Sequence, residues 1–75
     1  MPIYYPETFE QTKEFVNFVK SKKAVIISIE SCEKEIGVRI IDFLKGFCYG
    51  ANARFIVLND DKLYLILPEG MEIEE

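Results

Sequence analysis

The chain has 75 residues, and nine Lys and Arg against thirteen Asp and Glu leave a net charge of −4. A domain of this length buries only about 60–65% of the surface of its unfolded chain, so disulfides, a metal or association usually add stability. The negative charge argues against binding to nucleic acid, which needs a clustered positive surface. No apolar run approaches the roughly 18 residues of a membrane-spanning helix.

Histidine is absent, and the two cysteines are Cys32 and Cys48. They cannot supply the roughly four donors of a usual Cys/His metal site, and no catalytic pair based on histidine can form. Nothing marks a secreted protein, so two free thiols in a reducing cytosol are favoured over a disulfide. We therefore expect a cytoplasmic protein that has no cofactor and is not an enzyme. Association with a second copy is the remaining source of stability.

The first expected elements are a short strand and an amphipathic helix. The segment "PIYY" (2–5) is aromatic and β-branched, as strands often are. The next segment, "TFEQ", has the form of a capping box, in which Thr8 and Gln11 each bind a backbone N–H at a helix start. The helix is predicted over residues 8–21. Its apolar stripe consists of Phe9, Thr12, Phe15, Val16 and Val19.

A buried strand and a second helix are predicted next. The unbroken β-branched run "AVIISI" (24–29) is typical of a strand in the middle of a sheet. Ser31 is the expected N-cap of the helix, and Glu33 and Glu35 fall in its first turn, where negative charge is favourable. Apolar residues cover much of its circumference: Ile36, Val38, Ile40, Ile41, Phe43, Leu44 and Phe47.

The segment "RIIDFLKGFCYG" (39–50) contains two glycines, and Gly46 is followed by large apolar side chains. In one interpretation Gly46 lies inside the helix, where its missing Cβ lets another helix approach, and Gly50 ends the helix in the left-handed conformation. In the other interpretation Gly46 itself ends the helix. The first interpretation makes this region a contact between copies of the chain.

The last third of the chain predicts a β-hairpin. The strands "ARFIVL" (53–58) and "KLYLIL" (62–67) are joined by "NDD", which suits a tight turn. After Pro68, "MEIE" (71–74) offers a fifth strand. The order β-α-β-α-β-β-β predicts one α/β domain over residues 1–75, an α+β sandwich. Its mixed five-stranded sheet has both helices packed on one face.

Both faces of the two hairpin strands carry apolar side chains, because apolar residues occupy successive positions. Two helices can cover only one face, and soluble monomers rarely expose so large an apolar patch. We expect a second copy to bury the other face. This sheet-face dimer contact is assigned to Phe55, Val57, Tyr64 and Ile66.

Three segments, "KKAVIISI", "RIIDFLKGFCYG" and "KLYLILPEGMEI", resemble the C-terminal core of the SepF family of cell-division proteins. The spacing D-F-L-x-G-x-x-Y (42–49) is fairly specific where it lies between two such strands, and the likeness covers nearly the whole chain. The resemblance implies a core that dimerises, polymerises and binds the C-terminal tail of FtsZ at the division site. It also implies a membrane link through an N-terminal amphipathic helix and linker. No such helix is in this sequence, so we expect either a trimmed core or a divergent member without its own anchor.

The resemblance implies that FtsZ binding and self-association use the second helix. Arg39 would pair with a carboxylate of the tail, and Phe43 would line an apolar groove at the dimer junction. The alternative is that Phe43 and Leu44 are only core residues. Val38 replaces one of two adjacent basic residues common in the family, and Asn52 can supply the left-handed turn of its glycines. The expected site residues are Arg39, Asp42, Phe43, Gly46, Phe47 and Tyr49.

Two other hypotheses stay open. One is a dimeric small-molecule-sensing or general protein-interaction module, which needs a polar pocket for which the sequence offers few donors. The other is a thiol enzyme that uses Cys48. Its neighbours Phe47 and Tyr49 do not include the cation that would activate a thiolate.

Overall fold

A computed structural model describes residues 3–59 and 62–71. The elements of these residues follow the expected order as far as the hairpin. The expected fifth strand (71–74) lies outside the described residues, apart from Met71. In chain order the elements are β1 (Ile3–Tyr4), the 3-10 helix η1 (Phe9–Gln11), α1 (Thr12–Lys20), β2 (Val25–Ser28), α2 (Lys34–Gly50), β3 (Arg54–Asn59) and β4 (Leu63–Leu67).

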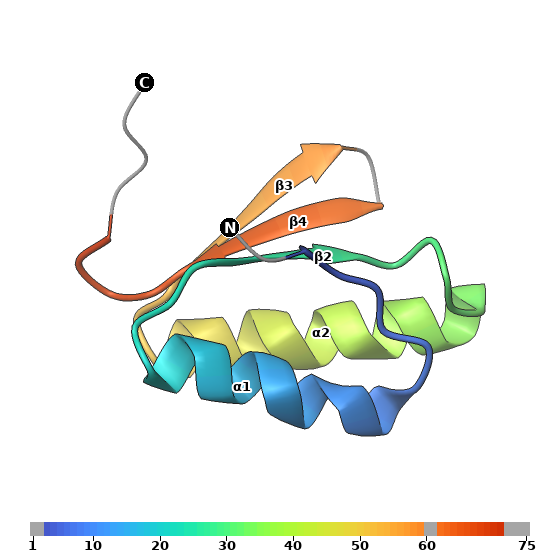
Figure 1. Cartoon of the computed structure of the whole chain (residues 1–75), viewed down its shortest axis with the longest axis horizontal. Helices are drawn as coiled ribbons and strands as arrows, with labels where there is room; N and C mark the ends of the chain where they lie inside the picture. Colours follow the sequence, from blue (N-terminus) through green and yellow to red (C-terminus); the bar gives the residue numbers. More distant parts are fainter. Residues whose placement is uncertain (1–2, 60–61, 72–75) are drawn as a thin grey trace.

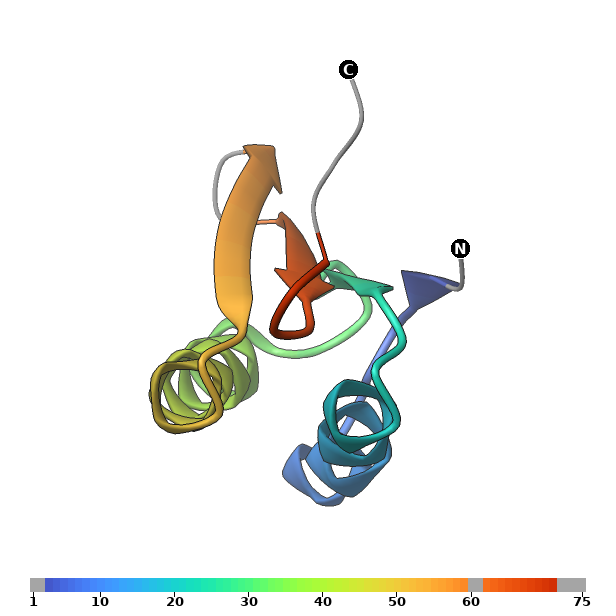
Figure 2. The ribbon, with the colours of Figure 1, turned by 90° about the vertical axis from the view of Figure 1, so that its left-hand side faces the viewer.

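The four strands of the described residues form one mixed sheet in the order β1-β2-β4-β3. β1 pairs with β2 in parallel, and β4 lies antiparallel between β2 and β3. β2 has neighbours on both sides, as its β-branched run predicts. Both helices lie on one face of this sheet, α1 near β2 and α2 near β3 (Figure 1 and Figure 2). The mixed fold with two helices on one face is therefore confirmed.

The main core lies between the sheet and the two helices. Phe15 of α1 and Ile40 and Leu44 of α2 are fully buried there, together with Ile27 and Ile66 of the sheet. Burying a side chain of this size contributes about 1.5–3 kcal/mol. These contacts fix the angle at which α2 lies against the sheet, and so decide which side of α2 faces outward.

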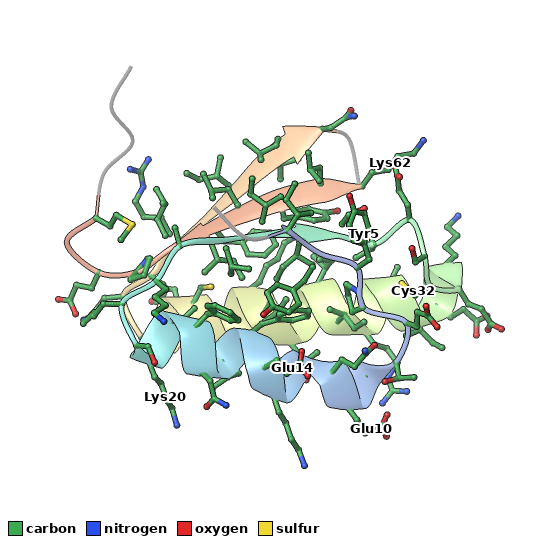
Figure 3. The ribbon with its side chains drawn as sticks, viewed as in Figure 1. Tyr5, Glu10, Glu14, Lys20, Cys32 and Lys62 are labelled. Atoms are coloured by element: carbon green, nitrogen blue, oxygen red, sulfur yellow. The ribbon has the colours of Figure 1, made fainter. Side chains whose placement is uncertain are left out.

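α1 is attached to the edge of the sheet through aromatic rings. The Tyr4 ring of β1 meets the rings of Phe15 and Phe18 edge-on, at centroid distances of 5.2 and 5.1 Å. Such edge-to-face pairs add about 0.5–1.5 kcal/mol to the burial of the rings. The polar side chains of Glu10 and Lys20 point away from the sheet (Figure 3).

The four residues assigned to the dimer contact lie on the face of the sheet that the helices cover. Ile66 of β4 is fully buried with Leu44 of α2, and Tyr64 is 4% exposed, so both point toward the helices. Phe55 lies opposite Ile66 and Val57 opposite Tyr64 in the ladder, which places these residues of β3 on the same helix-covered face. The alternation along each strand was right, but a period of two does not tell which face the helices cover.

The opposite face of the sheet carries a second apolar cluster. Leu65 pairs with Ile26 on one side and with Ile56 on the other, which forms one row across three strands. We call the whole cluster the open sheet face, because neither α1 nor α2 covers it. Its buried members are Ala24, Leu65 and Leu67, and its partly buried members are Ile26, Ile56 and Met71.

The start of the first helix follows its expected cap. Gln11 Oε1 accepts hydrogen bonds from the backbone N–H groups of Glu7 (2.6 Å) and Thr8 (3.0 Å). This is the Gln11 half of the capping box. The Thr12 hydroxyl donates to the Phe9 carbonyl (2.7 Å), so η1 leads into α1 with its backbone held on both sides.

The start of α2 differs from the prediction. Its N-cap is Glu33, with extended backbone angles (φ −61°, ψ 149°), and not Ser31. Ser31 lies in the preceding turn, where the Cys32 thiol donates to the carbonyl of Ile29 (3.3 Å). The turn occupies the residues that a helix beginning after Ser31 would need, so α2 starts two residues later.

α2 ends in a Schellman motif. The Ala53 N–H donates to the Cys48 carbonyl (2.8 Å), and the Asn52 N–H donates to the Tyr49 carbonyl (3.4 Å). Asn52 has a φ of 57° and is the left-handed residue of the motif. Gly50 was expected in that place, but it is the last residue of the helix.

Candidate functional site

The outward side of α2 presents most of the expected site residues to solvent. Gly37, Ile40, Ile41, Leu44 and Cys48 are its buried positions. Because an α-helix repeats every 3.6 residues, other positions face away from the core. We call the exposed residues of the expected site the α2 outer face; they are Arg39, Asp42, Phe43, Gly46 and Tyr49.

The α2 outer face includes two exposed aromatic rings. Phe43 is 41% exposed and Tyr49 is 89% exposed. Leu44 is fully buried, so it is a core residue, whereas Phe43 is not. Phe47 is half-buried and packs against the core, so of the six expected site residues it is the one that α2 turns inward.

Gly46 lies within α2, so the interpretation of this glycine as the helix end is wrong. A Cβ added to Gly46 would have no atom within 4 Å, and its φ is not in the left-handed region. A glycine inside a helix costs roughly 0.8–1.0 kcal/mol relative to alanine. The described fold therefore gives no internal reason for a glycine here, which leaves a contact outside the chain as an explanation.

Two residues of the α2 outer face meet a ring from η1. The Arg39 guanidinium carbon lies 4.9 Å from the centroid of the Phe9 ring, within the range of a cation–π contact. The Phe43 ring meets the same Phe9 ring edge-on, with centroids 5.6 Å apart and an interplanar angle of 71°. We call these three residues the Phe9 cluster. It joins a cation and an exposed aromatic ring on the shoulder of α2 that faces η1.

An open groove runs along the other shoulder of α2. Its volume is about 300 Å³. The charged groups around it are the ammonium groups of Lys34 and Lys45 and the carboxylate of Asp42, which also belongs to the α2 outer face. We call it the α2–β4 groove; its lining residues are Ile29, Lys34, Val38, Ile41, Asp42, Lys45 and Tyr64.

Aromatic rings also support one of the two cations of this groove, Lys45. The Lys45 ammonium lies 5.9 Å from the centroid of the Phe55 ring. The Phe55 and Tyr64 rings pack together with centroids 5.2 Å apart. α2 therefore has a cation held over an aromatic ring on each shoulder, Arg39 on one and Lys45 on the other.

The burial and raised pKa of the two thiols suit side chains that pack in the fold more than catalytic nucleophiles. Cys48 is 1% exposed, and burial raises the pKa of its thiol to about 11. Burial also raises the pKa of Cys32, and a hydrogen bond from its own backbone partly opposes this rise. Cys32 lies in the connection between β2 and α2, as Figure 3 shows. A thiol with a raised pKa is a poor nucleophile near neutral pH.

The described residues hold no group of three or more His, Cys, Asp or Glu side chains that could bind a metal ion. No helix among them has the length and apolar character needed to cross a membrane. The candidate site consists of charged, aromatic and apolar side chains on and beside α2.

Sequence reasoning found the α2 outer face but missed the residues that border it. Phe9 was read as one of several core positions of the first helix, and the lining residues Lys34 and Lys45 of the groove were not singled out. The signal for Phe9 was its place directly after Thr8 of the capping box, since the first apolar residue of a helix lies at its end and can reach a neighbouring element.

Comparison with known proteins identifies the family. The family model described as "Cell division protein SepF" matches residues 2–73. A cell division protein SepF from Acetivibrio thermocellus is 31% identical over 71 residues, which are 95% of this chain and 45% of the relative. Another, from Caldanaerobacter subterraneus subsp. tengcongensis, is 34% identical over 68 residues, which are 91% of this chain and 50% of the relative. The chain thus spans about half the length of these curated relatives.

A solved structure shares the fold. The SepF-like protein from Archaeoglobus fulgidus superposes with a TM-score of 0.83 over 97% of this chain and 89% of the other, at 12% sequence identity. The resemblance first seen in the segments around α2 and β4 is therefore confirmed, and this chain belongs to the cell division protein SepF family.

Proposed function

We propose that this chain is a non-enzymatic scaffold of cell division that self-associates and binds the C-terminal tail of FtsZ. In this role it would bundle, align or membrane-tether FtsZ filaments at the septum. The observation that carries the proposal is the α2 outer face, where an arginine and two aromatic rings are exposed together. Exposed aromatic and cationic side chains of this kind are typical of peptide-binding surfaces.

Two residues have specific roles in tail binding. Arg39 pairs with a carboxylate of the tail, because a guanidinium binds both oxygens of a carboxylate in one plane. Phe43 supplies the apolar contact beside it, since part of its ring remains exposed after it packs on Phe9. Asp42 and Tyr49 border the same surface and set which tail residues fit.

Self-association uses two other surfaces. The open sheet face forms the dimer contact in place of the helix-covered residues first assigned to it, because its apolar cluster lies on the side without helices. Gly46 allows a second contact, in which an α2 helix of another copy approaches α2 closely. Two independent contacts of this kind produce polymers as well as dimers.

Calorimetric titration with a synthetic peptide of the FtsZ tail from the same organism tests tail binding. The expected result is measurable heat with the wild type and about tenfold weaker binding, or worse, in Arg39→Gln, because a hydrogen bond to a charged group contributes about 1.5–3 kcal/mol. No heat at near-millimolar peptide, with a folded protein in the cell, would contradict the proposal.

The α2–β4 groove supports a second candidate, a site for a small anionic molecule. Its volume is at the lower end of the range for ligand pockets, and Lys34 and Lys45 supply two cations. A thermal-shift screen of anionic metabolites distinguishes the two functions. Stabilisation by a metabolite, without any response to the FtsZ peptide, would favour the small-molecule site.

A further inference from the structure

The Phe9 cluster brings together residues from two elements that are thirty residues apart in the chain. Arg39 and Phe43 lie one turn apart on α2, and Phe9 reaches both from η1. The Arg39 guanidinium lies over the Phe9 ring, and it makes no hydrogen bond or ion pair with the described residues. Glu35 and Asp42 occupy the helix positions where ion pairs with Arg39 usually form, yet neither is paired with it.

From this geometry we infer that Phe9 is a positioning residue that holds the Arg39 guanidinium ready for a carboxylate of a bound peptide. The inference rests on the proposed tail binding and adds a residue outside α2 to it. A cation–π contact uses no N–H···O hydrogen bond, so the guanidinium keeps its N–H donors for a ligand. An arginine that is already held also loses less rotamer freedom when the ligand binds, which increases affinity.

Phe9 is itself fixed by hydrogen bonds on both sides. The Gln11 side chain accepts from the N–H groups of Glu7 and Thr8, which precede Phe9. The buried Thr12 hydroxyl donates to the carbonyl of Phe9 across 2.7 Å. The capping box therefore does more than start a helix, because it also fixes the ring over which Arg39 lies.

The cluster selects a particular kind of peptide. An acidic side chain is bound by Arg39, and an apolar side chain close to it packs on the exposed part of Phe43. The edge-to-face packing of Phe43 on Phe9 makes the cation and the apolar surface one continuous site. The ligand class is thus a peptide with a carboxylate next to an apolar residue.

Phe9→Leu tests the inference, because it keeps an apolar side chain and removes the aromatic face. We expect it to weaken binding of the FtsZ tail peptide about two- to fivefold. Phe9→Tyr keeps an aromatic ring and should bind the peptide as the wild type does. In an Arg39→Gln background Phe9→Leu should have no further effect. Phe18→Leu is the matched control, since Phe18 packs on Tyr4 of β1. The Phe18→Leu variant should bind the peptide as the wild type does.

Two results would overturn the inference: wild-type affinity in Phe9→Leu, or the same loss from Phe9→Leu whether Arg39 is present or not. A second measurement does not depend on FtsZ. In the free protein the Phe9 ring should shift the NMR signals of the Arg39 side chain, and Phe9→Leu should remove the shift. Unshifted Arg39 signals in the wild type would refute the positioning role, whereas shifted signals without peptide binding would refute only the proposed tail function.

Discussion

Phe18 and Lys23 are joined across the end of α1 by a hydrogen bond of 2.9 Å from the Lys23 N–H to the Phe18 carbonyl. A second bond of 3.1 Å runs from the Lys22 N–H to the Val19 carbonyl, so α1 ends in a Schellman motif like that of α2. Lys22 has a φ of 61° and is the left-handed residue. A residue with a Cβ is disfavoured there by roughly 1–2 kcal/mol, which glycine avoids.

Lys22→Gly should therefore stabilise the domain. Part of the gain is lost because glycine is more flexible in the unfolded chain, so we expect a net increase of about 0.5–1 kcal/mol in the free energy of unfolding. Urea denaturation at a fixed protein concentration measures it. Lys20→Gly is the control, because Lys20 is the last residue of α1 and glycine there should destabilise. Destabilisation by Lys22→Gly would contradict the left-handed assignment.

Gly46→Ala and Gly46→Lys should both stabilise the monomer and differ in assembly. Nothing lies within 4 Å of a Cβ at Gly46, so each variant gains helix propensity, about 0.5–1 kcal/mol. The long lysine side chain should also prevent close approach of another α2. We expect Gly46→Lys to abolish polymers in light scattering while the dimer persists in sedimentation.

The control for the stability gain is on the same helix. A Cβ at Gly37 would lie 3.2 Å from Ile29 Cδ1 and 3.3 Å from Cys32 Sγ, so Gly37→Ala should gain less than Gly46→Ala. Unchanged polymers in Gly46→Lys would show that this glycine is not at a contact between copies.

The elements of this fold follow from local patterns in the sequence, whereas the faces that they present depend on tertiary packing. The β-branched run at 24–29 and the apolar spacing around Leu44 predicted a strand and a helix that the structure has. The sequence could not assign Ile66 to the helix side, because β4 is apolar on both faces and offers no contrast. Ser31 is not the N-cap, because the hydrogen bond from the Cys32 thiol to the Ile29 carbonyl holds the turn before α2. The preference of serine for N-caps takes no account of such a bond.

In the candidate site, too, the sequence predicts individual residues but not the contacts between elements. Arg39 and Phe43 were predicted from their motif, and the structure exposes both. Their contact with Phe9 could not be predicted, because it depends on where η1 lies relative to α2. That position is set by the packing of the elements and not by the local sequence. Contacts between elements distant in the chain require the packing to be known first.

Ile56→Lys and Val57→Lys should separate the two faces of β3 in one experiment. Ile56 lies on the open sheet face, and Val57, its neighbour, lies on the helix-covered face and is 55% exposed. A charge buried in a dimer contact without a partner costs several kcal/mol. We expect Ile56→Lys to be monomeric in sedimentation at micromolar concentration, and Val57→Lys to remain a dimer.

Circular dichroism checks that both variants are folded. A monomeric Val57→Lys beside a dimeric Ile56→Lys would restore the dimer face first predicted from the sequence. Dimers in both variants would mean that neither face of β3 forms the dimer contact, and α2 would then be the remaining surface for it.

The buried thiol of Cys48 should make the free energy of unfolding fall at high pH. Burial raises the pKa of its thiol from 9.0 to about 11, so the folded state favours the protonated form. This contribution to stability is fully present below pH 9 and is lost as the pH rises through about 11, because the unfolded thiol ionises first. Other groups titrate in the same range, and the comparison with Cys48→Ala cancels them. Between pH 9 and 11, the free energy of unfolding should fall more steeply in the wild type than in Cys48→Ala.

Thiol labelling checks the same assignment at neutral pH. With a pKa of about 11, the thiolate of Cys48 makes up about one part in 10⁴ at pH 7, and the side chain is buried as well. Cys32 is only half-buried and should react first with a thiol reagent, leaving Cys48 to react when the domain unfolds. Cys32→Ser identifies which thiol reacts. Rapid labelling of Cys48 in the folded Cys32→Ser variant would mean that its thiol is accessible, and the packing of α2 against the sheet would have to be looser than these contacts imply.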